Sequence, residues 1–396
     1  MIAERAAMIS YDEAARLIGE AAQPLASEQV AIAQAAGRVL AAPVIAHVDA
    51  PPADSSAMDG YAVREADLPG VLPVIGESFA GRGFAGTVAP GTCVRIFTGA
   101  PVPAGADRVV IQENVTREGE LATMPPGAGA WHIRQRGSDF TVGDILVEAG
   151  TRLGPRALVT AAGADLAKVE VWRRPRVIIL ATGDELAAPG EARLNAERIP
   201  ESVSFGVAAV AQEWGAEVVD TRRLRDDLAT MEQAAGEAIA QADLVVVTGG
   251  ASVGEKDFAK TMFAPCGLDL VFSKVAIKPG KPVWLGRCSS SLVMGLPGNP
   301  TSAMVTARLF FAPLVAGLSG RTARTDWVEV PLACELAACG DRETFVRARR
   351  TPAGAVPVGN QDSSAQAALA QADLLLRCRP NQAARQAGEL VDAIDF

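Results

Sequence analysis

Residues 175–186 read Pro-Arg-Val-Ile-Ile-Leu-Ala-Thr-Gly-Asp-Glu-Leu, and this stretch decides the fold class. Four large apolar residues at 177–180 predict a buried strand, and a polar loop follows directly. The order of strand, loop and helix then repeats until about residue 325. We expect further strands over 217–219, 244–247, 271–277, 283–285 and 292–294, and helices over 203–214, 228–241, 257–264 and from about residue 301. Strands that alternate with helices predict a mostly parallel sheet with helices on both faces.

The chain on either side of this α/β segment has a different pattern of apolar residues and glycines. Residues 11–42 and 148–172 are predicted to be helical and to belong together. Glycines at short intervals between them predict an inserted β module, and short apolar runs after residue 326 predict a second small β domain. We therefore predict four domains, which are a segmented helical domain (1–45 and 146–174), an inserted β-rich domain (46–145), an α/β domain (175–325) and a C-terminal β domain (326–396).

Composition excludes several classes of protein. The 396 residues carry 37 basic and 46 acidic side chains, a net charge of −9, which argues against nucleic-acid binding through a broad basic face. A hydrophobic content of 49% rules out disorder as the dominant state. With no Cys-x-x-Cys pair and two histidines, a zinc site is not expected, and the six cysteines indicate a reduced, cytosolic protein. We expect no signal peptide and no membrane span, because the most apolar segment, 303–318, is short and contains Arg308.

Acidic residues stand in three loops of the α/β segment, each after a predicted strand. Glu185 follows the strand at 177–181, Asp226 follows the strand that begins at 217, and Asp257 lies beyond the strand at 244–247. Ligands of open parallel sheets bind outside the carboxyl ends of the strands. Three carboxylates at this edge predict a magnesium site, since this ion prefers oxygen ligands and phosphate. Alternatively, Asp226 or Asp227 caps a helix and Glu185 is simply solvated.

The third of these loops is rich in glycine. Residues 249–254 read Gly-Gly-Ala-Ser-Val-Gly, so backbone N–H groups of Gly249, Gly250, Ser252 and Gly254 can approach an anion. The loop lacks the Gly-Lys-Ser/Thr ending of a Walker A loop. A tight turn between strand and helix explains the same pattern.

Lysines are concentrated in one region, with five of the six between residues 256 and 281. In an extended segment Lys274 and Lys278 face one side, with Val275 and Ile277 opposite. Two like charges on one side favour an anion between them, although a solvated pair of lysines remains the alternative. Gly-Leu-Pro-Gly-Asn-Pro at 295–300 then predicts a loop of fixed shape.

The β module contains three polar loops that are ambiguous one by one. They read Ser-Ala-Met-Asp-Gly-Tyr at 56–61, Arg-Ile-Phe-Thr-Gly-Ala-Pro at 95–101 and Arg-Gln-Arg-Gly-Ser-Asp at 134–139. Asp59-Gly60 could form a type I′ hairpin turn.

These segments together resemble the MoeA / gephyrin E-domain family, the molybdopterin molybdenumtransferases. The resemblance rests on SAMDGYAV (56–63), RIFTGAPVP (95–103), RQRGSDF (134–140), PRVIILATGDEL (175–186), TGGASVGEKD (248–257), KVAIKPGKP (274–282) and GLPGNP (295–300), which follow in order along the chain. It implies a segmented helical domain with an inserted β domain, a three-layer α/β domain of the MogA-like, molybdopterin-binding type, and a C-terminal β-barrel.

The resemblance also implies the reaction and the partners. Adenylylated molybdopterin and molybdate are the implied substrates, with Mg²⁺ as cofactor. The phosphoanhydride is hydrolysed, AMP leaves, and the dithiolene ligates molybdenum. Such proteins are cytoplasmic homodimers whose cleft lies between the α/β domain of one subunit and the inserted domain of the other. A transient contact with the adenylyltransferase is expected, and neither nucleic acid nor membrane is an expected partner.

The family's functional positions fall on expected residue types here. The implied catalytic residues are Asp59, Thr98, Asp139, Glu185, Asp226, Asp257, Lys274 and Lys278, of which Glu185, Asp226 and Asp257 would bind the metal. The implied residues for binding the pterin substrate are Arg134, Gly249, Gly250, Ser252, Gly254, Pro297, Pro300, Arg347 and Ser363.

Two positions depart from the family's pattern. Glu201-Ser202-Val203 stands where Asp-Ser-Asn is usual, which puts the start of the following helix and a substrate contact in question. Asp362 replaces a common glycine beside Ser363. These departures leave a divergent paralogue with an altered metal preference, for tungstate, as one alternative. A molybdopterin adenylyltransferase is a second, because it shares the α/β domain type, and a non-catalytic scaffold is a third.

Overall fold

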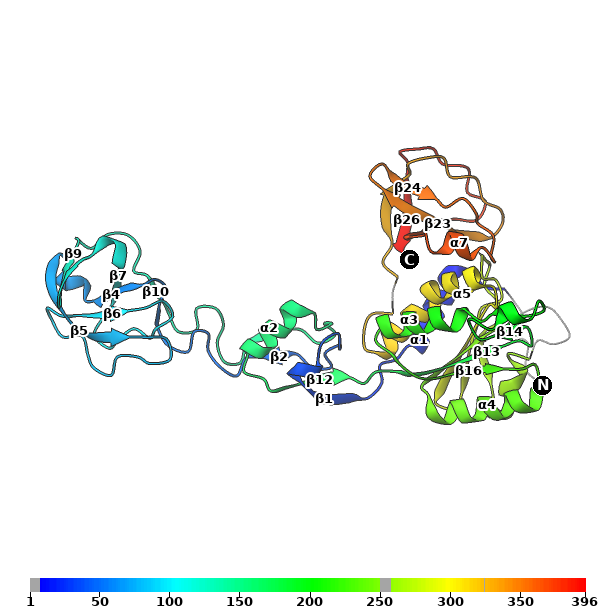
Figure 1. Cartoon of the computed structure of the whole chain (residues 1–396), viewed down its shortest axis with the longest axis horizontal. Coiled ribbons are helices and arrows are strands. Elements are labelled where there is room, and N and C mark those ends of the chain that lie inside the picture. The colour runs from blue at the N-terminus through cyan, green and yellow to red at the C-terminus, as the bar shows by residue number, and fades with distance from the viewer. Residues whose placement is uncertain (1–7, 250–257, 324) are drawn as a thin grey trace.

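The computed structural model describes residues 8–249, 258–323 and 325–396. Figure 1 shows an elongated molecule. The inserted β domain lies at one end and the α/β domain at the other, with a small body around helix α2 (Pro155–Gly163) between them. The C-terminal domain stands beside the α/β domain, over α5 (Pro300–Thr306).

The α/β domain contains the predicted mostly parallel sheet. Its strand order is β16-β13-β17-β21-β20-β18, and the first four strands are parallel. The strands are β13 (Arg176–Thr182), β16 (Glu217–Leu224), β17 (Leu244–Thr248), β18 (Asp269–Phe272), β20 (Trp284–Cys288) and β21 (Ser291–Leu296). The last two in the order, β20 and β18, are antiparallel to their neighbours.

Helices cover both faces of this sheet, as predicted. One core cluster joins the sheet to α3 (Val203–Glu213) and to the helix formed by α5, the π-helical turn η6 (Ala307–Phe311) and α6 (Ala312–Leu318). The other joins it to α4 (Leu228–Gln241) and the 3-10 helix η5 (Thr261–Cys266). In the described chain the helix Pro300–Leu318 alone is long and apolar enough to cross a membrane. However, 89% of its most apolar 18-residue stretch is buried, so we assign it to the core.

The segmented domain is less helical than predicted. Residues 11–42 form α1 (Tyr11–Ala21), β1 (Ser27–Ala31) and the 3-10 helix η1 (Ile32–Gln34), because Pro24 ends the helical stretch and β1 pairs with β12 (Lys168–Trp172). Residues 148–172 contain one helix, α2, which begins with a proline. The two parts of the chain are in contact through a second pair of strands, because β2 (Val44–Ile45) pairs with β11 (Ile145–Val147).

Helix α1 itself packs elsewhere. Tyr11 and Ile18 are 2% and 1% exposed and belong to the same core cluster as Val177 of β13 and Phe310 of the last long helix. The first helix of the chain therefore contributes to the α/β core, although the proposed boundaries assign it to the segmented domain.

The inserted domain contains a six-stranded sheet of order β7-β4-β6-β5-β9-β8. Its elements are β3 (Ser55–Ser56), β4 (Gly60–Val63), β5 (Gly70–Ser78), β6 (Cys93–Ile96), β7 (Arg108–Ile111), β8 (Thr116–Glu118), β9 (Leu121–Met124) and β10 (Ile133–Arg134), with short 3-10 turns η2 (Glu65–Asp67) and η3 (Gln112–Asn114). Asp59-Gly60 is not a hairpin turn, because β3 pairs with β10 whereas β4 pairs with β6 and β7.

The C-terminal domain is a curled sheet of order β19-β23-β25-β26-β22, with β24 beside β23. Its strands are β22 (Val328–Pro331), β23 (Glu343–Thr351), β24 (Gly354–Pro357), β25 (Leu374–Cys378) and β26 (Leu390–Asp395), with one short helix α7 (Gln366–Leu369). A bridge between Leu332 and Ala355 brings the two ends of the sheet together. Strand β19 (Ile277–Lys278) comes from the α/β region, so the two domains share one sheet.

Candidate active site

A cleft of about 640 Å³ opens at the carboxyl ends of β13, β17 and β21. Thr182 and Thr248 end the first two strands, and Pro297 follows the third. This is the edge where open parallel sheets bind their ligands. The predicted residues Glu185, Gly249, Pro297 and Pro300 all line the cleft.

Close backbone packing forms the floor of this cleft. Gly249 has φ +93°, and a Cβ placed there would lie 2.5 Å from the carbonyl oxygen of Thr182. A Cβ at Gly298 would lie 3.3 Å from the Cα of Gly249. Glycine at position 249 therefore permits the close approach of this loop to Thr182, and Gly298 packs directly against Gly249. Gly250, Ser252 and Gly254 lie outside the described residues.

Two of the three predicted acidic loops are adjacent. The backbone N–H of Asp226 donates to the Asp184 carboxylate at 3.3 Å, and Glu185 faces the cleft one residue further on. Helix capping falls to Asp227, whose carboxylate accepts from the Thr230 amide at 2.9 Å. Asp257 lies outside the described residues. Within 8–249, 258–323 and 325–396 no group of three or more metal-ligating side chains converges.

The C-terminal domain supplies the opposite wall through Ser364 and Gln366. Next to them, the Asn299 amide donates to the Ser363 hydroxyl at 3.1 Å, and the Thr301 N–H donates to the Ser363 carbonyl at 3.2 Å. Two loops from different domains are thus bonded where they form the cleft.

Arg347 supports this wall from behind. Its side chain is 1% exposed and donates to the carbonyl oxygens of Asn360, at 2.9 Å, and Asp362, at 3.2 Å. Burial lowers the pKa of the Arg347 guanidinium, and the charge of Asp362 opposes that shift. The Asp362 carboxylate accepts from the Ser364 amide and hydroxyl, so this departure from the family pattern caps a turn.

The other departure leaves the helix start intact. α3 begins at Val203, and the buried Glu201 carboxylate accepts from the Ser204 amide at 2.8 Å and from its hydroxyl at 2.5 Å. Glu201 therefore does the work of a capping side chain. Val203 lines the cleft, which makes this part of the wall apolar.

The lysine segment has the predicted alternation. Lys274 and Lys278 are exposed, whereas Val275 and Ile277 are fully buried. Neither lysine is among the described residues that line the cleft at the ends of β13, β17 and β21. Lys278 borders a separate cavity of about 530 Å³, between β19 and the C-terminal domain.

The predicted residues of the inserted domain form a second group. The Asp59 carboxylate accepts from both the amide and the hydroxyl of Thr98 at 2.7 Å, and these bonds hold the pKa of Asp59 below its ordinary value. Arg134 and Asp139 line a cavity of about 750 Å³ that also includes Gly99, the neighbour of Thr98. This group is remote from the cleft within one chain, because the two domains lie at opposite ends of the molecule (Figure 1).

Sequence reasoning missed several cleft residues. Thr182 and Thr248 could have been found, since they occupy equivalent places at the ends of neighbouring strands, and the Thr182 hydroxyl donates to the Thr248 carbonyl at 3.3 Å. Ser364 and Gln366 carry no local signal, because only the docking of the C-terminal domain brings them to the cleft.

Three family descriptions match consecutive parts of the chain. Residues 9–164 match the MoeA N-terminal region (domain I and II), residues 178–317 a probable molybdopterin binding domain, and residues 329–396 the MoeA C-terminal region (domain IV).

Whole relatives match over most of their length. A molybdopterin molybdenumtransferase of Haemophilus influenzae is 38% identical over 79% of this chain and 78% of its own. A molybdopterin molybdenumtransferase 2 of Mycobacterium tuberculosis is 37% identical over 77% of this chain and 78% of its own. The crystal structure of a molybdopterin biosynthesis MoeA protein from Pyrococcus horikoshii superposes with a TM-score of 0.85 at 26% identity, covering 98% of this chain and all of that one.

Proposed function

This chain belongs to the MoeA family of molybdopterin molybdenumtransferases, and on that premise we propose that it inserts molybdenum from molybdate into adenylylated molybdopterin with magnesium-dependent release of AMP. The chain is thus an enzyme of molybdenum cofactor biosynthesis. We propose that the enzyme acts in the cytoplasm.

The cleft at the ends of β13, β17 and β21 carries the proposal. It combines an acid, Glu185, with a glycine-bearing floor at Gly249 and rigid proline walls at Pro297 and Pro300. The floor suits a phosphate group, because backbone N–H groups reach an anion where no side chain intervenes. A cleft of about 640 Å³ is in the usual size range for small-molecule sites.

The donor set fits a magnesium ion. Mg²⁺ usually takes one or two carboxylates and completes its shell with water and substrate phosphates. Glu185 and Asp226, in adjacent loops, and Asp257 would hold it. When bound, the ion would neutralise charge on the phosphoanhydride as AMP leaves.

The remaining residues bind and orient the substrates. We assign Lys274 and Lys278 to the anionic oxygens of molybdate or of the substrate phosphates. Ser363 and the wall that Arg347 supports would hold the pterin substrate at the other side of the cleft. The alternation of exposed lysines with buried Val275 and Ile277 supports the first assignment.

A homodimer would complete the site. Asp59, Thr98, Arg134 and Asp139 lie far from Glu185 in one chain. If both groups act on one substrate, a second copy must bring its inserted domain to the cleft. We therefore propose a cleft shared between two subunits, and a transient contact with the adenylyltransferase that makes the substrate.

Conversion in vitro tests the function. Purified chain is incubated with adenylylated molybdopterin, molybdate and Mg²⁺, and both AMP and the molybdenum-containing product are measured. We expect stoichiometric formation of both, and loss of both when Mg²⁺ is withheld. Incorporation of AMP into molybdopterin would instead indicate an adenylyltransferase. Faster turnover with tungstate would indicate an altered metal preference. The absence of any turnover would indicate a non-catalytic scaffold.

A further inference from the structure

The segment that carries Lys274 and Lys278 is held between two other parts of the chain. On one side, the Ile9 amide donates to the Lys274 carbonyl at 3.2 Å, and the Ala276 amide donates to the Ile9 carbonyl at 2.7 Å. On the other, the Glu343 amide donates to the Ala276 carbonyl at 3.1 Å, where β19 pairs with β23. The position of the lysines therefore depends on where the N-terminal segment and the C-terminal domain lie.

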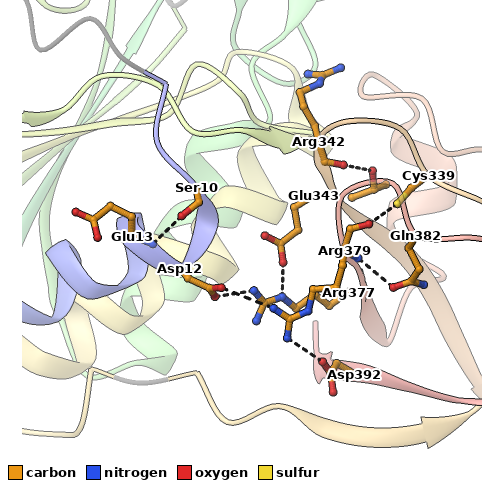
Figure 2. A network of polar contacts seen from close by, with 11 residues as sticks. Ser10, Asp12, Glu13, Cys339, Arg342, Glu343, Arg377, Arg379, Gln382 and Asp392 are labelled. Carbon is orange, nitrogen blue, oxygen red and sulfur yellow. Dashed lines mark hydrogen bonds and ion pairs between the residues drawn. The ribbon is translucent and has the colours of Figure 1, made fainter.

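Arginine side chains tie these two neighbours together, and Arg377 makes the closer contacts, because the Arg379 guanidinium lies 3.7 Å from the Asp12 carboxylate. Figure 2 shows Arg377 of β25 between Asp12 of α1 and Glu343 of β23. Its guanidinium pairs with the Glu343 carboxylate through Nε and with the Asp12 carboxylate at 2.6 Å through an amino group. We call Asp12, Arg377 and Glu343 the brace.

The brace is buried at one end and linked to a helix cap at the other. Arg377 and Glu343 are 5% and 6% exposed at the side chain, so water competes little for their charges. The Arg377 guanidinium also lies 4.6 Å from the centre of the Tyr11 ring and 5.3 Å from that of Trp327. At the other end, the Ser10 hydroxyl accepts from the Glu13 amide and fixes the turn that joins Ile9 to Asp12.

We propose that Arg377, acting through Asp12 and Glu343, is a positioning residue for Lys274 and Lys278. Hydrogen bonds and ion pairs form a closed ring from Ile9 through Ala276, Glu343 and Arg377 to Asp12 and back along the chain. Opening the ring frees the lysine segment on one side and lowers its affinity for an oxyanion. The inference rests on the proposed function, in which the lysines hold anionic oxygens.

The sharpest test opens the ring at its exposed end. Asp12 is 65% exposed at the side chain, so Asp12→Asn leaves no buried charge unpaired. In the full-length protein we expect the dissociation constant for molybdate, measured by calorimetry, to rise about three- to tenfold, the scale of indirect couplings. Asp12→Glu keeps the carboxylate and should restore most of the affinity.

Glu13→Gln is the matched control. Glu13 lies in the same helical turn, but its carboxylate pairs with Arg16 at the surface and not with the C-terminal domain. We expect the parental affinity for molybdate and a similar melting temperature. Equal affinities in the Asp12→Asn and Glu13→Gln variants would overturn the brace.

A second pair of measurements separates the brace from the function on which it rests. Suppose that Lys278→Gln weakens molybdate binding. Adding Asp12→Asn to the Lys278→Gln protein should then raise the dissociation constant for molybdate by a smaller factor than Asp12→Asn does alone, because both changes act on one contact. Full additivity would contradict the proposal. If Lys278→Gln leaves binding unchanged, the assigned role of the lysine falls. The brace then stands only if Asp12→Asn, and not Glu13→Gln, speeds hydrogen exchange at the amides of 275–278.

Discussion

Glu185 is the exposed acid of the described cleft, whereas the other acid that lines it, Glu201, is buried and bonded to Ser204. Removal of the Glu185 charge tests the metal assignment at the level of one residue. Glu185→Gln keeps the shape of the side chain and removes its charge. We expect AMP release at saturating Mg²⁺ to fall at least about a hundredfold, as when one preorganised electrostatic contact is lost. Asp257→Asn should have the same effect, with little change in melting temperature for either variant.

The control for Glu185→Gln lies in the same part of the chain. Glu191 is exposed and does not line the cleft, so Glu191→Gln should turn over at the parental rate. Full activity of the Glu185→Gln enzyme would remove this residue from the proposed metal site.

Lys278 provides the second prediction at this scale. A charge-assisted contact contributes about 1.5–3 kcal/mol, so Lys278→Gln should raise the dissociation constant for molybdate or the adenylylated substrate roughly ten- to a hundredfold. Lys278→Arg should restore only part of the affinity, because the planar guanidinium is larger than the ammonium. Lys168→Gln, at an exposed position of β12, is the control. Equal constants for parent, Gln and Arg forms would leave Lys278 a solvated surface lysine.

Single residues differ in how much of their role the sequence reveals. The alternation around Lys278 was predictable, because Val275 and Ile277 must be buried if an extended segment is to pack. The roles of Arg377 and Gln366 were not, since their contacts join parts of the chain that are distant in sequence. The acidic residues of the loops were predictable only in part. Their place at the strand ends followed from the alternation, but which aspartate caps α4 required coordinates.

At the scale of elements, the central strands depend on one close packing contact. Gly295 of β21 stands opposite Trp284 of β20, and a Cβ at Gly295 would lie 1.9 Å from the indole nitrogen. Trp284 is 1% exposed and packs edge-on against Phe263, so it has little room to move. Gly295→Ala should therefore lower the free energy of unfolding by about 1–3 kcal/mol or more, as overpacking does.

The control for this substitution is another glycine of the same domain. Gly236 lies within α4, and a Cβ there would meet no atom within 4 Å. Gly236→Ala should raise the stability by up to about 1 kcal/mol through helix propensity. Denaturant unfolding measures the stability of both variants and of the parent. A Gly295→Ala protein as stable as the parent would show that Trp284 moves aside at no cost in free energy.

Most of the α/β elements were predicted well because their signal is local. The strand expected over 271–277 was wrong, because this stretch contains the end of β18 and the start of β19, which belong to different sheets. The described part of the helix expected over 257–264 contains the start of the 3-10 helix η5. Helices over 203–213 and 228–241 and the strands beside them follow from apolar periodicity alone. The predicted helix over 11–42 was wrong beyond Ala21, since alanine-rich periodicity does not show that residues 27–31 pair with a strand about 140 residues later. For the same reason, the packing of α1 in the α/β core was not visible in the sequence.

At the scale of the whole molecule, the elongated shape separates two groups of functional candidates. The segmented body around α2 holds the inserted domain away from the α/β domain, so Asp59 and Glu185 cannot reach one ligand within this conformation of a single chain. Symmetric association of two copies would join each inserted domain to the other copy's cleft, and it would create two equivalent sites.

Mixing two inactive variants tests this arrangement. If the cleft is shared, Asp59→Ala should inactivate the inserted-domain half of both clefts of its homodimer, and Glu185→Ala should inactivate the α/β half. In a heterodimer of the two, one cleft receives both changes and the other receives neither. Random exchange of equal amounts places half of the chains in heterodimers, so the mixture should recover about a quarter of the parental AMP release. Mass spectrometry or differential tagging confirms that heterodimers have formed. If they form and the mixture stays inactive, both residues act in the same subunit's cleft, and the shared site is wrong.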